Sequence, residues 1–245
     1  MQIAYSIIVP IYNEADNILP LIEEIEWVMN TNPNSWEVIF VDDGSQDASL
    51  CILQKLVKSK PYLRCLQLKQ NYGQTSAFAA GVKAARGTYV ISLDGDGQND
   101  PRDIPLLINT CTAENLDLVT GKRKNRQDPW YKRMIGKVAN RVRSSVLEDN
   151  VQDTGCSLKI YRRSCLEQIQ LFKGMHRFLP ALFQIQGFRT KEVPVHHRSR
   201  TRGKSKYHLF NRGLSLFFDL LAVAWMKKRR IAYVVEREFA SEDVL

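Results

Sequence analysis

The sequence predicts an α/β fold built on an open, mostly parallel sheet flanked by helices. Short runs rich in β-branched and aromatic residues recur along the first 120 residues, and stretches with helical periodicity separate them. Apolar strands that alternate with helices are typical of βαβ units around a buried sheet. The predicted strands are Ile7–Val9, Val38–Val41, Leu63–Leu68, Tyr89–Leu93 and Leu116–Val119, and the clearest predicted helix carries Ile18, Leu21, Ile22, Ile25 and Val28.

The composition is that of a folded, basic protein. Of its 245 residues, 44% are hydrophobic and 25% are charged, which excludes a disordered chain. The net charge of +9 indicates an anionic partner, whether nucleic acid, anionic lipid or a phosphorylated substrate. The five cysteines are widely spaced and form no C-x-x-C pair, so they indicate neither a zinc site nor a disulfide framework and predict a reducing compartment.

Carboxylate-rich segments follow three of the predicted strands. The segment 13–16 follows the first strand, 42–45 the second and 94–98 the fourth. Loops after the strands of a parallel sheet bind ligands, because the helix N-termini there present free N–H groups and the positive end of a dipole. The sequence therefore places the candidate site at this edge of the sheet.

Asp94 and Asp96 are the strongest metal-binding candidates. Two aspartates separated by one glycine can direct oxygen atoms toward one point, and Mg²⁺ needs only one or two carboxylates when phosphate oxygens complete its shell. Gly95 and Gly97 would allow close approach and unusual backbone angles. A solvated acidic turn is the alternative, and the position after a buried strand, together with the second acidic loop at 42–43, argues against it.

Other phosphate-binding and metal-binding motifs are excluded. A calcium loop needs Gly at its sixth position and Glu at its twelfth, where the run from Asp94 has Asn99 and Pro105. The sequences G-x-G-x-x-G and G-x-x-x-x-G-K-[ST] are both missing, which excludes a dinucleotide oxidoreductase and a P-loop enzyme. If the site binds a pyrophosphate group, a metal and basic side chains must therefore neutralise its charge.

Seven short motifs occur in order along the chain: Pro10–Glu14, Val41–Ser45, Asn71–Gln74, Asp94–Gln98, Gly121–Arg123, Gln152–Cys156 and Arg200–Tyr207. Together they resemble family 2 glycosyltransferases of the dolichol-phosphate mannose synthase and polyprenyl-phosphate glycosyltransferase group. The resemblance runs from about residue 5 to residue 226. It implies a GT-A fold with a catalytic domain over 1–206, a C-terminal amphipathic helix over 207–230 and an acidic tail over 231–245.

The resemblance also implies roles for individual residues. The residues implied to bind the donor nucleotide are Pro10, Tyr12, Glu14, Asp42, Asp43, Asp94, Gly95, Gln98 and Lys206. The implied ligands of Mg²⁺ or Mn²⁺ are Asp94, Asp96 and Gln98. The implied catalytic group is Asp96, Arg123, Asp153 and Arg200. Simpler alternatives exist for three of them, namely a packing role for Tyr12, a helix-start charge for Glu14 and a surface charge for Arg123.

The implied reaction is an inverting transfer of a hexose from a GDP- or UDP-linked donor to dolichyl or undecaprenyl phosphate. A phosphate monoester is already ionised at neutral pH, so Asp153 is expected to orient or tune the acceptor rather than act as a strong base. One alternative acceptor is a saccharide in cell-envelope polysaccharide synthesis. A nucleic-acid-binding module that uses the basic stretches 122–143 and 198–212 is a further alternative, but no reader motif is present and no nucleic-acid partner is expected.

The segment Tyr207–Met226 predicts a helix at a membrane surface. One helical face carries apolar side chains, and four cations follow at 227–230; the face residues are Phe210, Leu214, Phe217, Leu221 and Trp225. Such a helix suits anionic lipid, and core packing is the alternative because the opposite face is also apolar. The most apolar stretch, Leu214–Met226, has 13 residues (226 − 214 + 1) and contains Asp219, so it is shorter than the roughly 20 apolar residues that span a bilayer. We expect a cytoplasmic protein, peripheral on the cytoplasmic face of a membrane, with a separate anchor protein as a candidate partner.

Overall fold

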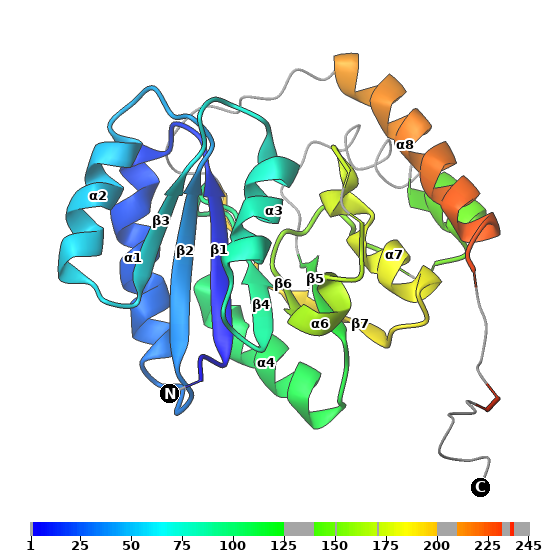
Figure 1. Ribbon diagram of the computed structural model, residues 1–245, viewed down its shortest axis with the longest axis horizontal. Coiled ribbons are helices and arrows are strands. Elements are labelled where there is room, and N and C mark those ends of the chain that lie inside the picture. The colour runs from blue at the N-terminus through cyan, green and yellow to red at the C-terminus, as the bar shows by residue number, and fades with distance from the viewer. Residues whose placement is uncertain are drawn as a thin grey trace, which may run out of the picture.

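Figure 1 shows an open sheet with helices on both of its faces. The computed structural model describes residues 2–124, 140–149, 151–170, 172–199, 210–231 and 236–237. Within these residues, seven strands form one sheet in the order β3-β2-β1-β4-β6-β5-β7. The strands are β1 (Tyr5–Ile11), β2 (Trp36–Asp42), β3 (Leu63–Gln67), β4 (Tyr89–Ser92), β5 (Leu118–Arg123), β6 (Lys159–Arg162) and β7 (Thr190–Val195).

The sheet is mostly parallel. β1 pairs in parallel with β2 and β4, and β2 pairs in parallel with β3. β6 lies antiparallel between β4 and β5, and β7 runs parallel to β5. The open, mostly parallel sheet predicted from the sequence is therefore confirmed. β1 and β2 are buried along nearly their whole length because helices cover both faces, which is why each reads as a continuous apolar run.

The sequence analysis did not anticipate β6 and β7. β6 has only four residues and carries a cation at each end, and β7 begins with three polar residues and contains Pro194. Neither strand has the continuous apolar run that identifies a buried strand. β5 also begins and ends later than expected, over Leu118–Arg123 instead of Leu116–Val119.

The helices are α1 (Ala15–Met29), α2 (Ser49–Ser59), α3 (Gln74–Ala84), α4 (Ile104–Ala113), α6 (Arg163–Leu166), α7 (Leu179–Ile185) and α8 (Phe210–Lys228), with 3₁₀ turns η1 (Pro101–Asp103) and η2 (Met175–Arg177). Residues 140–147 are helical as well. Successive side chains of β1 point to opposite faces of the sheet. Ile7 and Val9 join a core with α1, α2 and α4, whereas Ile8 joins a second core with α3, α7 and α8.

The predicted C-terminal helix is present as α8. Its first expected residues, 207–209, and the side chains at 210 and 214 lie outside the described set. Val223 packs into the second core with no exposed surface, whereas Phe217, Leu221 and Trp225 are 54%, 47% and 62% exposed. One side of α8 therefore packs on the core, as the alternative interpretation expected, while the apolar face predicted to lie on a membrane surface is exposed.

Close packing of α3 against the sheet depends on a glycine. A Cβ atom at Gly81 would lie 2.4 Å from Ile8 Cγ2 and 3.3 Å from Val41 Cγ2. We expect Gly81→Ala to lower the free energy of unfolding by about 1–2 kcal/mol, because overpacking outweighs the better helix propensity of alanine. Urea denaturation measures the change, with Lys83→Ala on the exposed side of α3 as the control. An unchanged midpoint for Gly81→Ala would contradict this packing.

Candidate functional site

Two cavities meet where β1 and β4 end. The Tyr12 cavity, of about 520 Å³, is lined by residues that include Tyr12, Glu14 and Asp43. The Lys159 cavity, of about 530 Å³, is lined by residues that include Gln98, Arg123, Lys159, Tyr161, His176 and Arg177. Both cavities share Pro10, Gln74, Asp94 and Asp96. The two predicted metal ligands therefore lie at the junction of the cavities.

The loop after β4 has the backbone that its glycines were predicted to allow. Gly97 has a φ of +72°, in the left-handed region. A Cβ atom at Gly95 would lie 2.6 Å from Ile11 Cγ2, so glycine lets this loop lie directly on β1. The backbone N–H of Gln98 donates to Asp96 Oδ1 at 3.0 Å, which fixes the turn.

Asp94 and Asp96 suit a divalent cation. Desolvation first, and then the neighbouring charge of Asp96, raise the pKa of Asp94 to about 6. Asp94 Oδ1 accepts a hydrogen bond of 2.8 Å from Gln74 Nε2, which orients the carboxylate. The described residues contain no group of three or more His, Cys, Asp or Glu that could hold a metal ion. The pair is therefore a partial shell of hard oxygen ligands, which phosphate oxygens and water would complete.

The Tyr12 cavity gathers the residues predicted for the nucleoside. Asp43 is buried, and its two carboxylate oxygens accept hydrogen bonds from the backbone N–H groups of Tyr72 (2.7 Å) and Gly73 (2.8 Å). Asp43 therefore shapes the wall that residues 71–73 form. Glu14 accepts a hydrogen bond of 2.6 Å from Asn17 Nδ2, so it is oriented by its own helix.

Asp42 differs from the other predicted donor-binding residues. Its side chain is fully buried and lines neither cavity. Its Oδ1 accepts from the backbone N–H of Ser45 at 3.1 Å, while its Oδ2 has no hydrogen-bond partner among the described residues. Pro10, Tyr12, Glu14 and Asp43 thus line one cavity together, whereas Asp42 is not part of its lining.

Arg123 and Asp153 form a paired group at the side of the Lys159 cavity. Arg123 Nε donates to Asp153 Oδ2 at 2.7 Å, and Arg123 Nη2 donates to Asp153 Oδ1 at 2.8 Å. The backbone N–H of Arg123 also donates to Oδ2 at 3.1 Å. Arg123 lines the cavity, and Asp153 holds its guanidinium in place from behind. The alternative of Arg123 as a plain surface charge does not fit this geometry.

Two predicted residues, Arg200 and Lys206, lie outside the described residues. The chain just before them contacts the loop that follows β4. The backbone N–H of Arg198 donates to Gln98 O at 2.9 Å, and Arg198 Nη2 pairs with Asp100 at 2.7 Å. Burial acts to raise the pKa of Asp100, but Arg102 and Arg198 outweigh it and hold that pKa at about 2. Arg198, two residues before Arg200, is thus held against the segment 98–100 that follows Asp96.

Sequence reasoning missed several residues of the Lys159 cavity. They include Lys159 on β6 and His176 on η2, while Gln74 on α3 stood in the motif Asn71–Gln74 but was given no role. Burial lowers the pKa of Lys159, while nearby Cys156, Asp94 and Asp153 act in the opposite direction. A lysine inside the short apolar stretch 156–161 was the one local signal that the sequence offered.

A mostly parallel sheet with paired carboxylates between two cavities defines an enzyme of the GT-A glycosyltransferase class. The sequence agrees with this class over most of its length, because the family model described as Glycosyl transferase family 2 matches residues 6–170. The chain belongs to this family and is an enzyme of the glycosyltransferase type. The resemblance noted in the motifs is therefore confirmed.

Individual proteins extend the comparison. The dodecaprenyl-phosphate galacturonate synthase of Rhizobium johnstonii is 40% identical over 227 residues, which cover 91% of this chain and 67% of the relative. Glucosyl-3-phosphoglycerate synthase of Mycobacterium tuberculosis, solved with Mn²⁺ and UDP, superposes with a TM-score of 0.68 at 17% identity over 91% of this chain and 79% of its own. TarS of S. aureus, solved with UDP-GlcNAc, gives a TM-score of 0.61 at 19% identity over 92% of this chain and 66% of its own. These solved structures show a shared fold.

Proposed function

We propose that the enzyme transfers a hexose from a GDP- or UDP-linked donor to the phosphate of a polyprenyl lipid, with inversion at the anomeric carbon. The observation that carries the proposal is the position of Asp94 and Asp96 at the junction of two cavities. A donor whose diphosphate lies on this pair places its nucleoside in one cavity and its sugar in the other. The similarity to a dodecaprenyl-phosphate galacturonate synthase supports a polyprenyl phosphate acceptor.

The proposed roles follow from this placement. Pro10, Tyr12, Glu14 and Asp43 form the nucleoside side. Asp94, Asp96 and Gln98 would hold Mg²⁺ or Mn²⁺, and the Mn²⁺ in the mycobacterial glucosyl-3-phosphoglycerate synthase supports a divalent ion. When bound, such an ion stabilises the negative charge that grows on the departing diphosphate. Gly95 allows the loop to lie close to β1, and Arg123 adds a fixed positive charge near the leaving group.

The chemistry needs no strong base. An oxygen of the acceptor phosphate attacks the anomeric carbon as the bond from that carbon to the diphosphate oxygen breaks, and the nucleoside diphosphate leaves. The acceptor oxygen is already ionised at neutral pH. Asp153 accepts two side-chain hydrogen bonds from Arg123, and this arrangement supports a role in orienting Arg123 rather than in removing a proton.

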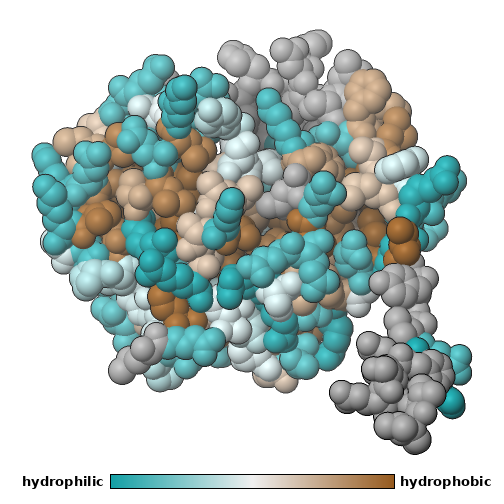
Figure 2. Space-filling view, viewed as in Figure 1, coloured by the Kyte–Doolittle hydropathy of each residue, from teal (hydrophilic) through white to brown (hydrophobic). Residues whose placement is uncertain are grey.

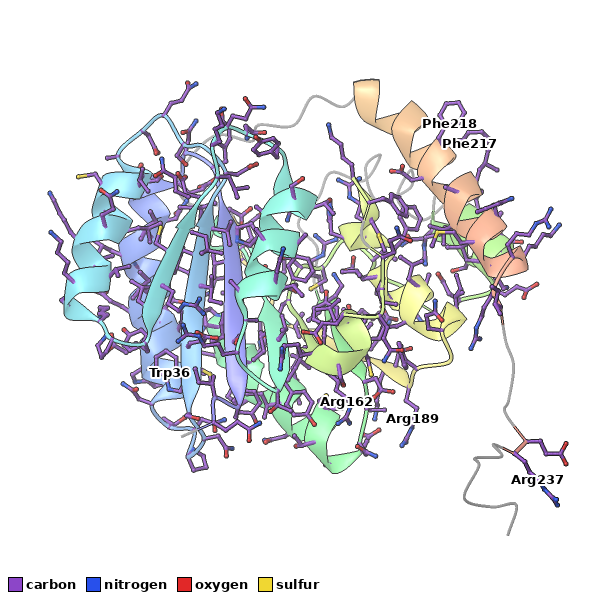
Figure 3. The ribbon with its side chains drawn as sticks, in the orientation of Figure 1. Trp36, Arg162, Arg189, Phe217, Phe218 and Arg237 are labelled. Atoms are coloured by element: carbon purple, nitrogen blue, oxygen red, sulfur yellow. The ribbon has the colours of Figure 1, made fainter. Side chains whose placement is uncertain are left out.

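The exposed face of α8 supports docking on a membrane surface. Phe217 and Phe218 point away from the body of the protein in Figure 3. Figure 2 shows hydrophobic residues along α8 and hydrophilic ones near its end, where four cations lie at 227–230. None of the described helices combines the length and apolarity of a bilayer span. The proposal keeps the division into a catalytic domain (1–206), an interfacial helix (207–230) and an acidic tail (231–245), on a cytoplasmic membrane face with a separate anchor protein.

A transfer assay tests the proposed function. Purified enzyme is incubated with Mn²⁺ or Mg²⁺, undecaprenyl phosphate and radiolabelled GDP- or UDP-linked hexoses. We expect label in an organic-extractable product that is lost when the lipid phosphate or the divalent ion is omitted. Label that enters a water-soluble saccharide instead would favour the saccharide acceptor, and no product from any donor would contradict the proposal.

The membrane role of α8 has its own test. We expect Phe217→Ser combined with Phe218→Ser and Trp225→Ser to weaken binding to vesicles at least about tenfold, because large aromatic surfaces leave the interface. Sedimentation with 7:3 phosphatidylcholine:phosphatidylglycerol vesicles measures the binding. Trp27→Ser is the matched control, since Trp27 is also exposed but lies on α1. Equal weakening by the control, or tight binding by the triple variant, would exclude α8 as the docking face.

A further inference from the structure

The floor of the Lys159 cavity carries a buried cation that the proposed reaction does not use. Lys159 is only 3% exposed, and it lies on β6 directly beside Ser92 of β4, two residues before Asp94. Its Nζ donates to the backbone oxygen of Cys156. An ammonium group loses its hydration on burial, and this cost is large unless a negative charge compensates it.

Among the described residues no carboxylate forms an ion pair with Lys159, although Asp94 and Asp153 lie near enough to act on its charge. Asp153, the nearest candidate on the β5 side, is held by the Arg123 side chain through two hydrogen bonds. Asp94 accepts from Gln74 and faces the junction where the diphosphate is placed. The hydrogen bond that Lys159 Nζ donates among these residues goes to a neutral carbonyl oxygen. A carboxylate on a bound ligand would supply the ion pair that the described residues do not.

The position of Lys159 identifies the part of the ligand that reaches it. The nucleoside lies beyond Asp94 and Asp96 in the opposite direction, toward Tyr12 and Asp43. Gly174, just before η2, lies against Asp219 of α8, since an added Cβ at Gly174 would lie 2.7 Å from Asp219 Oδ2. Lys159 lines the cavity on the other side of Asp94 and Asp96, where the proposed function places the donor sugar.

We propose that Lys159 is a specificity-determining residue that pairs with a carboxylate on the donor sugar, so that the preferred donor is a nucleotide-linked hexuronate. This inference rests on the proposed function for the direction in which the donor lies. Tyr161, on the same face of β6, and Phe78 on α3 line the cavity together with Lys159, and their rings lie 5.9 Å apart between centroids. A neutral hexose would leave the buried cation without a partner, and a site with an unpaired buried group discriminates strongly.

The test compares matched donors. We measure kcat/KM with UDP-galacturonate against UDP-galactose, UDP-glucuronate against UDP-glucose, and GDP-mannuronate against GDP-mannose. In the pair that contains the natural donor, the wild-type enzyme is expected to have a kcat/KM for the uronate about a hundredfold or more above that for the neutral sugar. Lys159→Met keeps the length of the side chain and removes its charge, and it is expected to reduce that preference about a hundredfold, because kcat/KM falls far more for the uronate than for the neutral sugar. Lys191→Met, exposed on β7, is the control.

Two results would overturn the inference. One is a wild-type preference for the neutral donor in every pair. The other is an equal loss with both donors in Lys159→Met, which would assign Lys159 to a phosphate that all donors share. Calorimetry of the same donors with Mn²⁺, without any lipid, gives the ratio of dissociation constants directly. The preference is thereby tested even if no lipid product forms, so the inference and the proposed function fail independently.

Discussion

Asp96→Asn and Asp94→Asn are each expected to lower kcat/KM for sugar transfer by about a thousandfold or more. The reason is that each substitution removes one of the two carboxylates that hold the ion at the junction of the cavities, and such an ion contributes several kcal/mol to stabilisation of the leaving diphosphate. The transfer assay with undecaprenyl phosphate measures the loss. Asp16→Asn, an exposed aspartate of α1 that lines neither cavity, is the matched control.

The same substitution at Asp94 is expected to act on stability in the opposite direction. The pKa of Asp94 is raised to about 6 in the folded protein, above its ordinary value of 3.8. The folded state therefore binds more protons than the unfolded state between about pH 4 and pH 6, and the stability of the metal-free protein falls as the pH rises through that window. Asp94→Asn removes this loss, which amounts to about 3 kcal/mol at most.

Thermal unfolding of metal-free protein at pH 7 separates the two effects. Asp94→Asn is expected to raise Tm by several degrees, at about 2–4 °C per kcal/mol for a chain of this size, while transfer is lost. Mn²⁺ with UDP or GDP should raise the Tm of the wild type and leave that of Asp94→Asn nearly unchanged. A lower Tm for the variant, or transfer close to that of the wild type, would show that the pair serves the fold rather than the ion.

The sequence was informative wherever structure and chemistry are local. β1 and β2 were predictable because both faces of the sheet are covered, so each strand is an uninterrupted apolar run. Asp43, Asp94 and Asp96 were predictable because they directly follow such strands. The loop geometry at Gly97 followed from the same local motif.

Parts of the site that depend on distant contacts were not predictable. Lys159 reaches the cavity only because β6 inserts antiparallel beside β4, and nothing in a four-residue strand with charged ends indicates that insertion. His176 Nδ1 lies 2.8 Å from Thr75 Oγ1, a contact between residues 101 positions apart. Arg123 and Asp153 were both named from their motifs, but only the structure shows that they bind each other.

Asp153→Ala is expected to lower the free energy of unfolding by about 3 kcal/mol, because it leaves the Arg123 guanidinium largely buried without its partner. Arg123→Met is expected to have a similar effect on stability through the buried Asp153 carboxylate. The double variant replaces the whole pair with apolar groups, and its stability should recover by more than about 1 kcal/mol relative to either single variant. Urea denaturation of the four proteins measures this cycle.

Activity in the same four proteins distinguishes a structural pair from a functional one. If Asp153 serves to orient Arg123 toward the donor, kcat/KM should fall about a hundredfold or more in both single variants and stay equally low in the double variant, although its stability has recovered. A pair that only stabilises the fold would regain activity together with stability. If Asp153 were instead an essential base, Asp153→Ala would lose far more activity than Arg123→Met, and the difference would widen as the pH falls below the second pKa of the acceptor phosphate, near 6.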